Sequence, residues 1–401
     1  MGGGPIAMTE FAEPVLETQP SGPTDPPSEA PVEPAPPARN LPFKFTGTGG
    51  EYFRIWVVNL LLTIVTLGIY SAWAKVRKTR YFWSNTQLDG AAFQYHGRPG
   101  AILRGRILVG VIFLAYSLAG RISIQAGVVG AAVLGVLAPW FFYKAMRFKL
   151  SNTTWRGVRF GFDSTVGAAY GALAPAVILW VLLAAELATM RPGEKPNPAP
   201  ILVLEGVFFA LVPFLHARIK RYQHRATTWG SQKFEFEPST GAFYGLYGKT
   251  FLVGFVPFLL VGLLIGVGVV TMKGSSSGWA PFLPLVAYPV FLLLYFVPVS
   301  YFSARLQRLV WARTHGGAFR FSTTVRTRGL MRTWLKNGLL TLLTVGLYWP
   351  FAAVNIARYQ IECMTLEAAA SPGSITAGSL AIEPSAAGDG AVDFFGWDVG
   401  L

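Results

Sequence analysis

Cysteine and histidine are scarce in this sequence, and their scarcity argues against several classes of site. Cys363 is the single cysteine, so the chain can form neither an internal disulfide framework nor a cysteine-based metal cage. The four histidines show no ligand spacing such as His-x-x-x-His: His96, His216, His224 and His315. No Ser-His-Asp or Cys-His arrangement and no phosphate loop of the Walker type is present. We therefore expect no metal, no cofactor and no enzymatic activity.

Charged residues are also few, at 13% of the chain, whereas 52% are apolar and 14% aromatic. With a mean hydropathy of +0.43, this composition indicates a polytopic membrane protein. Residues 1–40 lack a basic segment followed by an apolar one, so we expect no cleavable signal peptide. Rich in Pro, Glu, Gly and Ala, they cannot bury enough apolar surface to fold, which predicts a disordered tail.

Eight apolar runs are suited to crossing ~30 Å of hydrocarbon. They lie at about 55–74, 102–120, 122–143, 166–189, 200–217, 250–271, 280–302 and 335–355. Six of them form three pairs joined by short turns at 121, 191–200 and 273–279, which predicts three transmembrane helical hairpins. The first and last runs are single.

The net charge of +14 would suggest nucleic acid in a soluble protein, but the positions of the charges argue otherwise. The connectors 75–106, 144–159, 218–249 and 305–336 hold 26 of the 34 Lys and Arg residues, and the three short turns hold four. The positive-inside rule places these connectors in the cytoplasm and the turns outside. A nucleic-acid partner is then unnecessary, and we expect the connectors to contact anionic lipid headgroups.

Each connector contains a polar β-prone run, a glycine turn and then a Phe-x-Phe or Phe-x-Tyr pair. The pairs are Phe93/Tyr95, Phe160/Phe162, Phe234/Phe236 and Phe319/Phe321, and Phe43/Phe45 precedes the first run. This pattern predicts short β-hairpins, with Asp89-Gly90 as a type I′ turn. We interpret the hairpins as a cytoplasmic cap or interfacial anchor; direct ligand binding by the aromatic pairs is the alternative.

The chain opens and closes its apolar part with one motif. NLLLTIVTLGIYSAWA at 59–74 recurs as NGLLTLLTVGLYWPFA at 337–352, an ungapped offset of 278. Helical spacing puts the polar residues of each copy on one face. These stripe candidates are Asn59, Thr63, Thr66 and Tyr70, repeated as Asn337, Thr341, Thr344 and Tyr348. They predict either interhelical hydrogen bonds or a substrate or ion path.

Glu186 and Glu205 are carboxylates inside otherwise uncharged runs, and intramembrane carboxylates are functional candidates. Proton or cation coupling is one interpretation. The other is local pairing with Arg191 or Lys195 in the nearby turn.

The first and last runs allow two topologies. About 20 apolar residues make ~30 Å of helix and can span. If these runs instead return to the face they entered, as each pair does, the helix must break at 66–68 and again at 344–346. Protein or water would have to surround such a break, so the re-entrant topology predicts that both motifs lie at the centre of the bundle and face a cavity.

The segments FKFTGTGGEYFRIWVVNLLLTIVTLGIYSAWAKVRKTRYFWSNTQLDG at 43–90 and TLLTVGLYWPFAAVNIARYQ at 341–360 resemble the YjgN-like inner-membrane proteins, the domain-of-unknown-function family 898. The resemblance covers roughly 41–366 and implies a multispanning protein of the bacterial inner membrane. It brings no agreed activity, substrate or catalytic residues. After Arg358-Tyr359 no Phe-x-Phe pair follows, so a final hairpin is not expected.

We therefore expect an all-α polytopic membrane protein with three transmembrane hairpins, two terminal re-entrant or spanning segments and short cytoplasmic β-hairpins. A disordered tail at 1–40 precedes the membrane domain at 41–366, whose ends 52–81 and 330–359 are homologous, and a flexible tail at 367–401 follows. A solute or ion permease of unknown substrate is the first functional hypothesis. The second is a non-transporting protein that organises lipid, envelope components or partner proteins through its basic, aromatic cytoplasmic face.

Overall fold

The computed structural model describes residues 2, 39–189, 197–237, 239–272 and 283–369. Apart from Gly2, these residues belong to one unit, Pro37–Leu401. Its elements are β1 (Arg39–Phe45), α1 (Gly49–Val65), α2 (Ser71–Ser84), β2 (Thr86–Leu88), β3 (Ala91–Tyr95), α3 (Pro99–Ile122), α4 (Ile124–Ser151), β4 (Thr153–Trp155), β5 (Val158–Phe162), α5 (Val166–Ala188), α6 (Ala199–Ala226), β6 (Thr227–Trp229), β7 (Gln232–Lys233), β8 (Glu235–Phe236), α7 (Thr240–Met272), α8 (Leu283–Trp311), β9 (Thr314–Gly316), β10 (Phe319–Thr323), α9 (Thr327–Leu343), α10 (Trp349–Glu362) and β11 (Met364–Ala368).

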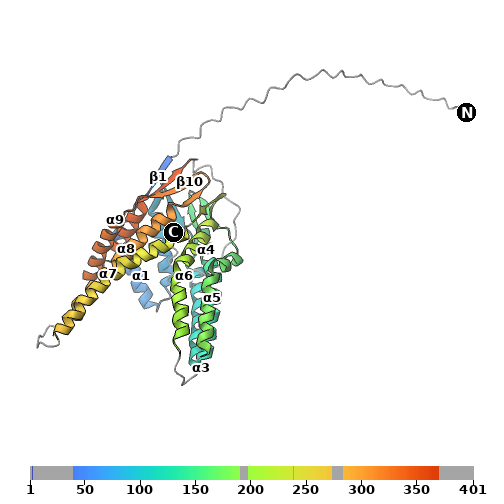
Figure 1. The fold of residues 1–401 in the computed structure, drawn as a ribbon. Helices are drawn as coiled ribbons and strands as arrows, with labels where there is room; N and C mark the ends of the chain where they lie inside the picture. The colour runs from blue at the N-terminus through green and yellow to red at the C-terminus, as the bar shows by residue number, and fades with distance from the viewer. Residues whose placement is uncertain (1, 3–38, 190–196, 238, 273–282, 370–401) are drawn as a thin grey trace, which may run out of the picture. The chain divides into compact units, whose positions relative to one another are not determined.

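These elements repeat a strand–helix–helix–strand order five times along the described chain, as β1-α1-α2-β2, β3-α3-α4-β4, β5-α5-α6-β6, β8-α7-α8-β9 and β10-α9-α10-β11. The two strands of each unit pair antiparallel with one another. Each helical hairpin therefore leaves the sheet and returns to it, and Figure 1 shows the helices extending from one side of the sheet.

The strands of all five units join in a single sheet of order β7-β6-β5-β4-β3-β2-β1-β11-β10-β9-β8. Its two ends, β7 and β8, are separated in the chain by Phe234 alone, whose N–H donates to the Thr227 carbonyl at 3.2 Å. The sheet is thus a nearly closed barrel. The protein is mostly helical, as predicted, but the description "all-α" is wrong: hairpin edges pair with one another because an isolated two-stranded hairpin is marginal in water.

The hairpin turns follow the sequence prediction. Asp89 and Gly90 both have positive φ, 49° and 72°, as a type I′ turn requires. Arg156-Gly157 does the same, with φ values of 50° and 75°. The described residues after Arg358-Tyr359 form no final hairpin, in line with the expectation, but they do form a single strand. This strand, β11, pairs with β1 on one side and with β10 on the other.

The strand aromatics fill the barrel. One buried cluster contains Leu41, Phe43, Leu88, Phe93, Trp155, Trp229, Phe234, Phe319, Leu366 and Ala368. Phe93 stacks between Phe43 and Trp155, with ring centroids 6.3 and 5.8 Å away. Phe43, Phe93, Phe234 and Phe319 are therefore buried against other strand residues, where they pack the hairpins together.

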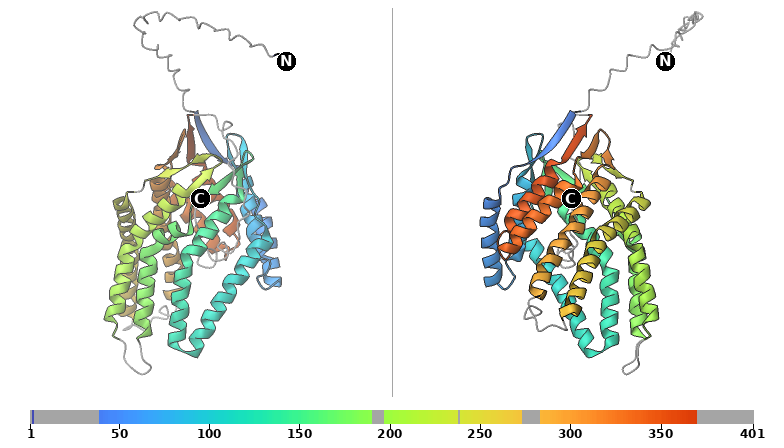
Figure 2. Two further views of the ribbon diagram at one scale, coloured as in Figure 1. Left: turned by 90° about the vertical axis from the view of Figure 1, so that its right-hand side faces the viewer. Right: turned by 60° about the vertical axis from the view of Figure 1, so that its left-hand side comes forward.

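Five described helices are long and apolar enough to cross a membrane: α3, α4, α5, α6 and the Thr240–Gly268 part of α7. Each helix contacts the next along the chain, and α10 contacts α1, so the ten helices follow one another in a ring. Figure 2 shows that α3–α6 reach farther from the sheet than α1 does. The units differ in length while sharing one topology.

The first and last apolar runs are each broken into two short helices. α1 ends at Val65 and α2 begins at Ser71, while α9 ends at Leu343 and α10 begins at Trp349. The two broken hairpins are neighbours, since β1 pairs with β11 and α1 contacts α10. The re-entrant topology predicts that protein or water surrounds the two breaks, and the described residues of the protein do not surround them. Leu67 is 94% exposed and Val345 93% exposed, because each turn projects beyond the contacts of its own hairpin.

Candidate functional site

The break between α1 and α2 is organised by a threonine and a glycine. Thr66 Oγ1 donates to the Leu62 carbonyl at 2.7 Å and accepts the Tyr70 N–H at 2.9 Å. Gly68 has a φ of 92°, and its N–H donates to the Thr63 carbonyl at 2.8 Å. The threonine thus ends one helix and begins the next, while the glycine supplies the left-handed backbone.

The break between α9 and α10 has the same geometry. Thr344 Oγ1 donates to the Leu340 carbonyl at 2.8 Å and accepts the Tyr348 N–H at 3.0 Å. Gly346 has a φ of 90° and donates to the Thr341 carbonyl at 2.7 Å. Residues 278 positions apart therefore form the same hydrogen bonds and adopt the same backbone conformation in both turns.

All backbone N–H groups in the two turns are hydrogen-bonded within their own hairpin, from 66 to 71 and from 344 to 349. Unpaired backbone donors and unpaired backbone acceptors both disfavour placing a turn in hydrocarbon. These turns leave no donor unpaired. Their side chains at Leu67 and Val345 are apolar and exposed, so each turn presents a surface that suits an apolar medium.

The remaining stripe residues lie closer to the sheet, and their hydroxyls are also used locally. Thr63 Oγ1 donates to the Asn59 carbonyl at 2.6 Å, and Thr341 Oγ1 donates to the Asn337 carbonyl at 2.7 Å. Bonds from a hydroxyl to the carbonyl four residues earlier satisfy the side chain within its helix. These hydrogen bonds of Thr63 and Thr341 stay within one helix, so they neither join two helices nor leave the hydroxyl hydrogens free to line a path.

The two asparagines are buried and bridge the helices of their hairpins. Asn355 Nδ2 donates to Asn337 Oδ1 at 2.9 Å, and Arg77 Nη1 donates to Asn59 Oδ1 at 3.4 Å. Arg77 also donates to the Tyr70 hydroxyl at 3.0 Å.

Sequence reasoning missed the partners Arg77 and Asn355. They are related by the offset of 278 that links the two motifs, but their residue types differ, so the repeat alone did not mark them.

The two carboxylates are remote from these motifs in the fold. Glu186 lies half-buried near the end of α5, and Glu205 lies exposed in the second turn of α6. Both are at the end of their hairpin away from the sheet, on α5 and α6, whereas the stripes belong to α1, α9 and the turns that follow them. The predicted partners Arg191 and Lys195 lie outside the described residues.

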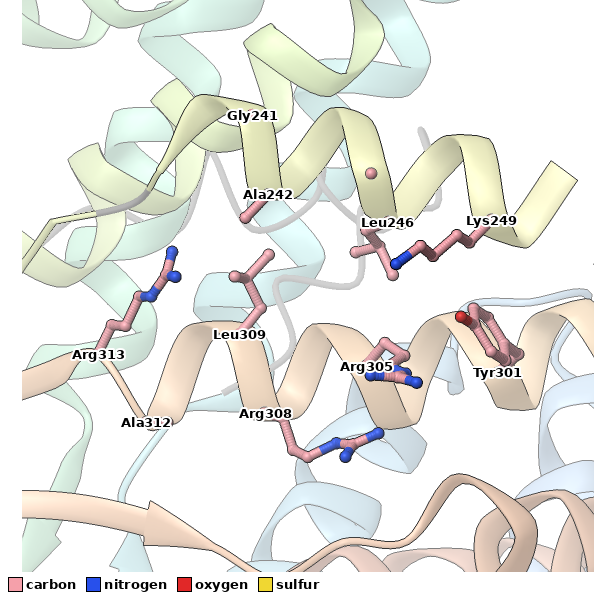
Figure 3. A pocket seen from close by; sticks show the side chains of 11 residues that line it. Gly241, Ala242, Leu246, Lys249, Tyr301, Arg305, Arg308, Leu309, Ala312 and Arg313 are labelled. Carbon is pink, nitrogen blue, oxygen red and sulfur yellow. The ribbon is translucent and has the colours of Figure 1, made fainter.

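A groove of about 560 Å³ lies between α7 and the end of α8 (Figure 3). Its lining includes four cationic side chains and no acidic one: Lys249, Arg305, Arg308 and Arg313. Small residues of α7, Gly241, Ala242 and Gly245, form part of one wall. The groove is therefore open, strongly basic and close to the sheet.

The cations of this groove are held differently. In Figure 3, Lys249 and Arg313 reach into the space between the helices, while Arg308 points away from α7. Arg308 Nη2 donates to Thr327 Oγ1 at 2.8 Å, and Arg305 lies over the Tyr301 ring at 5.6 Å. Burial, and then the charge of Arg305, lowers the pKa of Arg308, which lies beyond the predicted run 280–302.

Sequence comparison supports a membrane location. The chain is 26% identical to the inner membrane protein YjgN of Salmonella typhimurium strain LT2 over 353 residues, covering 79% of this chain and 85% of that protein. It is 25% identical to YjgN of Escherichia coli O157:H7, covering 80% and 87%, and 25% identical to YjgN of Escherichia coli K12, covering 80% and 87%. No solved structure is significantly similar to the chain.

The family model for bacterial proteins of unknown function, DUF898, matches residues 40–394. Among the described residues, this match takes in every helix, both broken hairpins and the whole sheet apart from Arg39. Together with relatives that are inner membrane proteins, it identifies this chain as a multi-helix membrane protein of the DUF898 family.

Proposed function

We propose that this protein organises phospholipid in the cytoplasmic leaflet of the bacterial inner membrane, and that it does so without transporting a solute. Three long hairpins would cross the bilayer, while the two broken hairpins would enter from the sheet side, turn within the hydrocarbon and return. The observation that carries the proposal is the pair of apolar turns at 66–71 and 344–349, in which every backbone N–H is hydrogen-bonded within its own hairpin.

The lengths of the broken hairpins support a half-depth insertion. In α1 the apolar part after Arg54 ends at Val65, about 16 Å at 1.5 Å per residue. In α9 the part after Lys336 ends at Leu343, about 10 Å. Both are shorter than the ~30 Å hydrocarbon core. Lipids beside these hairpins would meet protein in one leaflet only, and the bilayer must adjust its thickness there.

The polar groups favour this function over the permease hypothesis. The stripe threonines are hydrogen-bonded within their helices, and Asn337 is paired with Asn355. The candidate carboxylates Glu186 and Glu205 lie on other helices. An ion path needs polar groups that converge and remain available to the ion, and these residues do not converge.

Depth measurements test the proposal. Nitroxide labels placed by Leu67→Cys and Val345→Cys, in a Cys363→Ser background in liposomes, should be relaxed by oxygen more than by a water-soluble nickel chelate. A matched label at Glu51→Cys, in the first turn of α1, should show the opposite accessibility. Water-exposed turns would contradict the proposal.

A second experiment separates lipid organisation from transport. An impermeant thiol reagent added to intact cells should leave Thr48→Cys unlabelled, because the start of α1 would face the cytoplasm. Labelling from outside would instead mean that the first run spans the membrane.

A flux measurement tests transport itself. Solute flux in proteoliposomes that is lost with Glu186→Gln or Asn59→Ala would restore the permease hypothesis.

A further inference from the structure

We infer that the groove between α7 and α8 binds the phosphate-bearing headgroup of an anionic lipid. This inference rests on the proposed lipid-organising function and gives it a specific headgroup site. The groove brings together Lys249 from α7, Arg305 from α8 and Arg313 from the turn that follows α8, with no acidic residue in its lining.

The positive charge in the groove is uncompensated within the described residues. Lys249 and Arg313 have no ion pair or hydrogen bond there, and Arg305 contacts only the face of Tyr301. Like charges that converge from two helices repel one another unless an anion lies between them. A phosphate supplies the negative charge that this groove lacks, and its oxygens accept hydrogen bonds from Lys and Arg.

The position of the groove selects a lipid over a soluble anion. Lys249 directly precedes the apolar run 250–271, and Tyr301 lies at the end of the run 280–302. The groove thus lies where the predicted spans meet the sheet-side headgroups, a level that favours Lys, Arg and Tyr. From there a headgroup can enter the groove while its acyl chains remain beside the exposed apolar side chains Phe251 and Leu252.

The small residues of α7 leave room for the headgroup. A Cβ built at Gly245 meets no atom within 4 Å, so the wall at this point is open space. At about 560 Å³, the groove is also within the ~300–1,000 Å³ range of ligand pockets in proteins. The open wall and the positive charge of the groove therefore suit an anionic group that lies close to the backbone of α7.

The test measures lipid retained by the full-length protein in native mass spectrometry, with dioleoylphosphatidylglycerol as the anionic probe and dioleoylphosphatidylcholine as the zwitterionic one. Gly245→Leu fills the groove without changing charge. Gly248→Leu is its matched control, because a Cβ at Gly248 also meets nothing within 4 Å and this residue does not line the groove. Lys249→Gln/Arg313→Gln removes charge, and Arg225→Gln/Arg320→Gln removes two exposed cations elsewhere.

We expect wild type to retain phosphatidylglycerol in preference to phosphatidylcholine. Binding of phosphatidylglycerol should fall roughly fivefold for each groove cation removed, and Gly245→Leu should lower it as well, while both controls bind as wild type does. Equal binding by the groove variants and wild type would overturn the groove site and leave the proposed function standing. No preference for phosphatidylglycerol in wild type would also overturn the groove site, whereas the depth measurements at Leu67 and Val345 test the proposed function independently.

Two further outcomes also contradict the inference. If the control pair Arg225→Gln/Arg320→Gln weakens binding as much as the groove pair does, then diffuse surface charge accounts for the binding. If millimolar inorganic phosphate displaces the lipid completely, then the groove recognises the free anion and the assignment to a lipid is wrong.

Discussion

Asn355 donates its side-chain amide to Oδ1 of the buried Asn337 at 2.9 Å, and this bond joins the two helices of the last hairpin. In the first hairpin the corresponding positions hold Arg77 and Asn59, whose side chains meet at 3.4 Å. The two hairpins thus have an interhelical hydrogen bond at the same position, formed by two amides in one and by a guanidinium and an amide in the other. Substitutions at this position test how much the bond stabilises a hairpin.

Asn355→Leu should destabilise the protein because it leaves Asn337 Oδ1 without its interhelical donor. We expect a loss of roughly 1–2 kcal/mol, measured by unfolding in mixed micelles. Replacing both asparagines by leucine should cost less than the sum of the two single substitutions, since neither polar group is then left unpaired. Additive losses would show that the two amides do not interact.

Thr66→Val should weaken the first turn because it removes the acceptor for the Tyr70 N–H. In the apolar medium proposed for this turn, a donor left without a partner costs about 1–3 kcal/mol. Thr66→Ser keeps the hydroxyl and serves as the control. Hydrogen–deuterium exchange over 66–71 should be faster in the valine variant and near wild type in the serine variant; equal exchange in both variants would contradict this role.

Gly68→Ala should destabilise the chain by about 1–2 kcal/mol, because an L-residue with a side chain is disfavoured at the φ of 92° found there. Space does not limit the substitution, since a Cβ at Gly68 meets no atom within 4 Å. Gly110→Ala in α3 is the matched control. It has the same open surroundings within a regular helix, so it should stabilise by about 0.5–1 kcal/mol. The melting temperatures of the two variants should therefore move in opposite directions.

The single cysteine should react slowly with thiol reagents. Burial raises the pKa of the Cys363 thiol, so at pH 8 a smaller fraction is the reactive thiolate. The rate of alkylation by N-ethylmaleimide should continue to rise with pH beyond the range in which an exposed thiol levels off. Glu362→Cys in a Cys363→Ser background provides that exposed thiol, and identical pH profiles would rule out the effect.

Local signals in the sequence predicted several features of the fold. Asp89-Gly90 predicts its turn because few other dipeptides adopt positive φ at both positions. Thr66 and Gly68 predict the break through the same kind of local chemistry, since a hydroxyl can cap a helix end and a glycine can adopt the left-handed backbone. The apolar runs predict membrane helices because composition and length are enough to do so.

The partners of those local elements were decided only in the tertiary structure. Whether β11 forms depends on β1, more than 300 residues away in the chain, and on β10, about 40 residues away. Short strands carry too little local preference to predict this pairing. The same holds for Arg77 with Asn59, and for the groove in which Lys249 meets Arg305 and Arg313. By itself, the sequence determined which segments are apolar, where they turn and which residues are charged. Packing of the five units decided which polar groups are paired and which remain available to a ligand, because hydrogen bonds and charge clusters depend on distances between segments that no local pattern encodes.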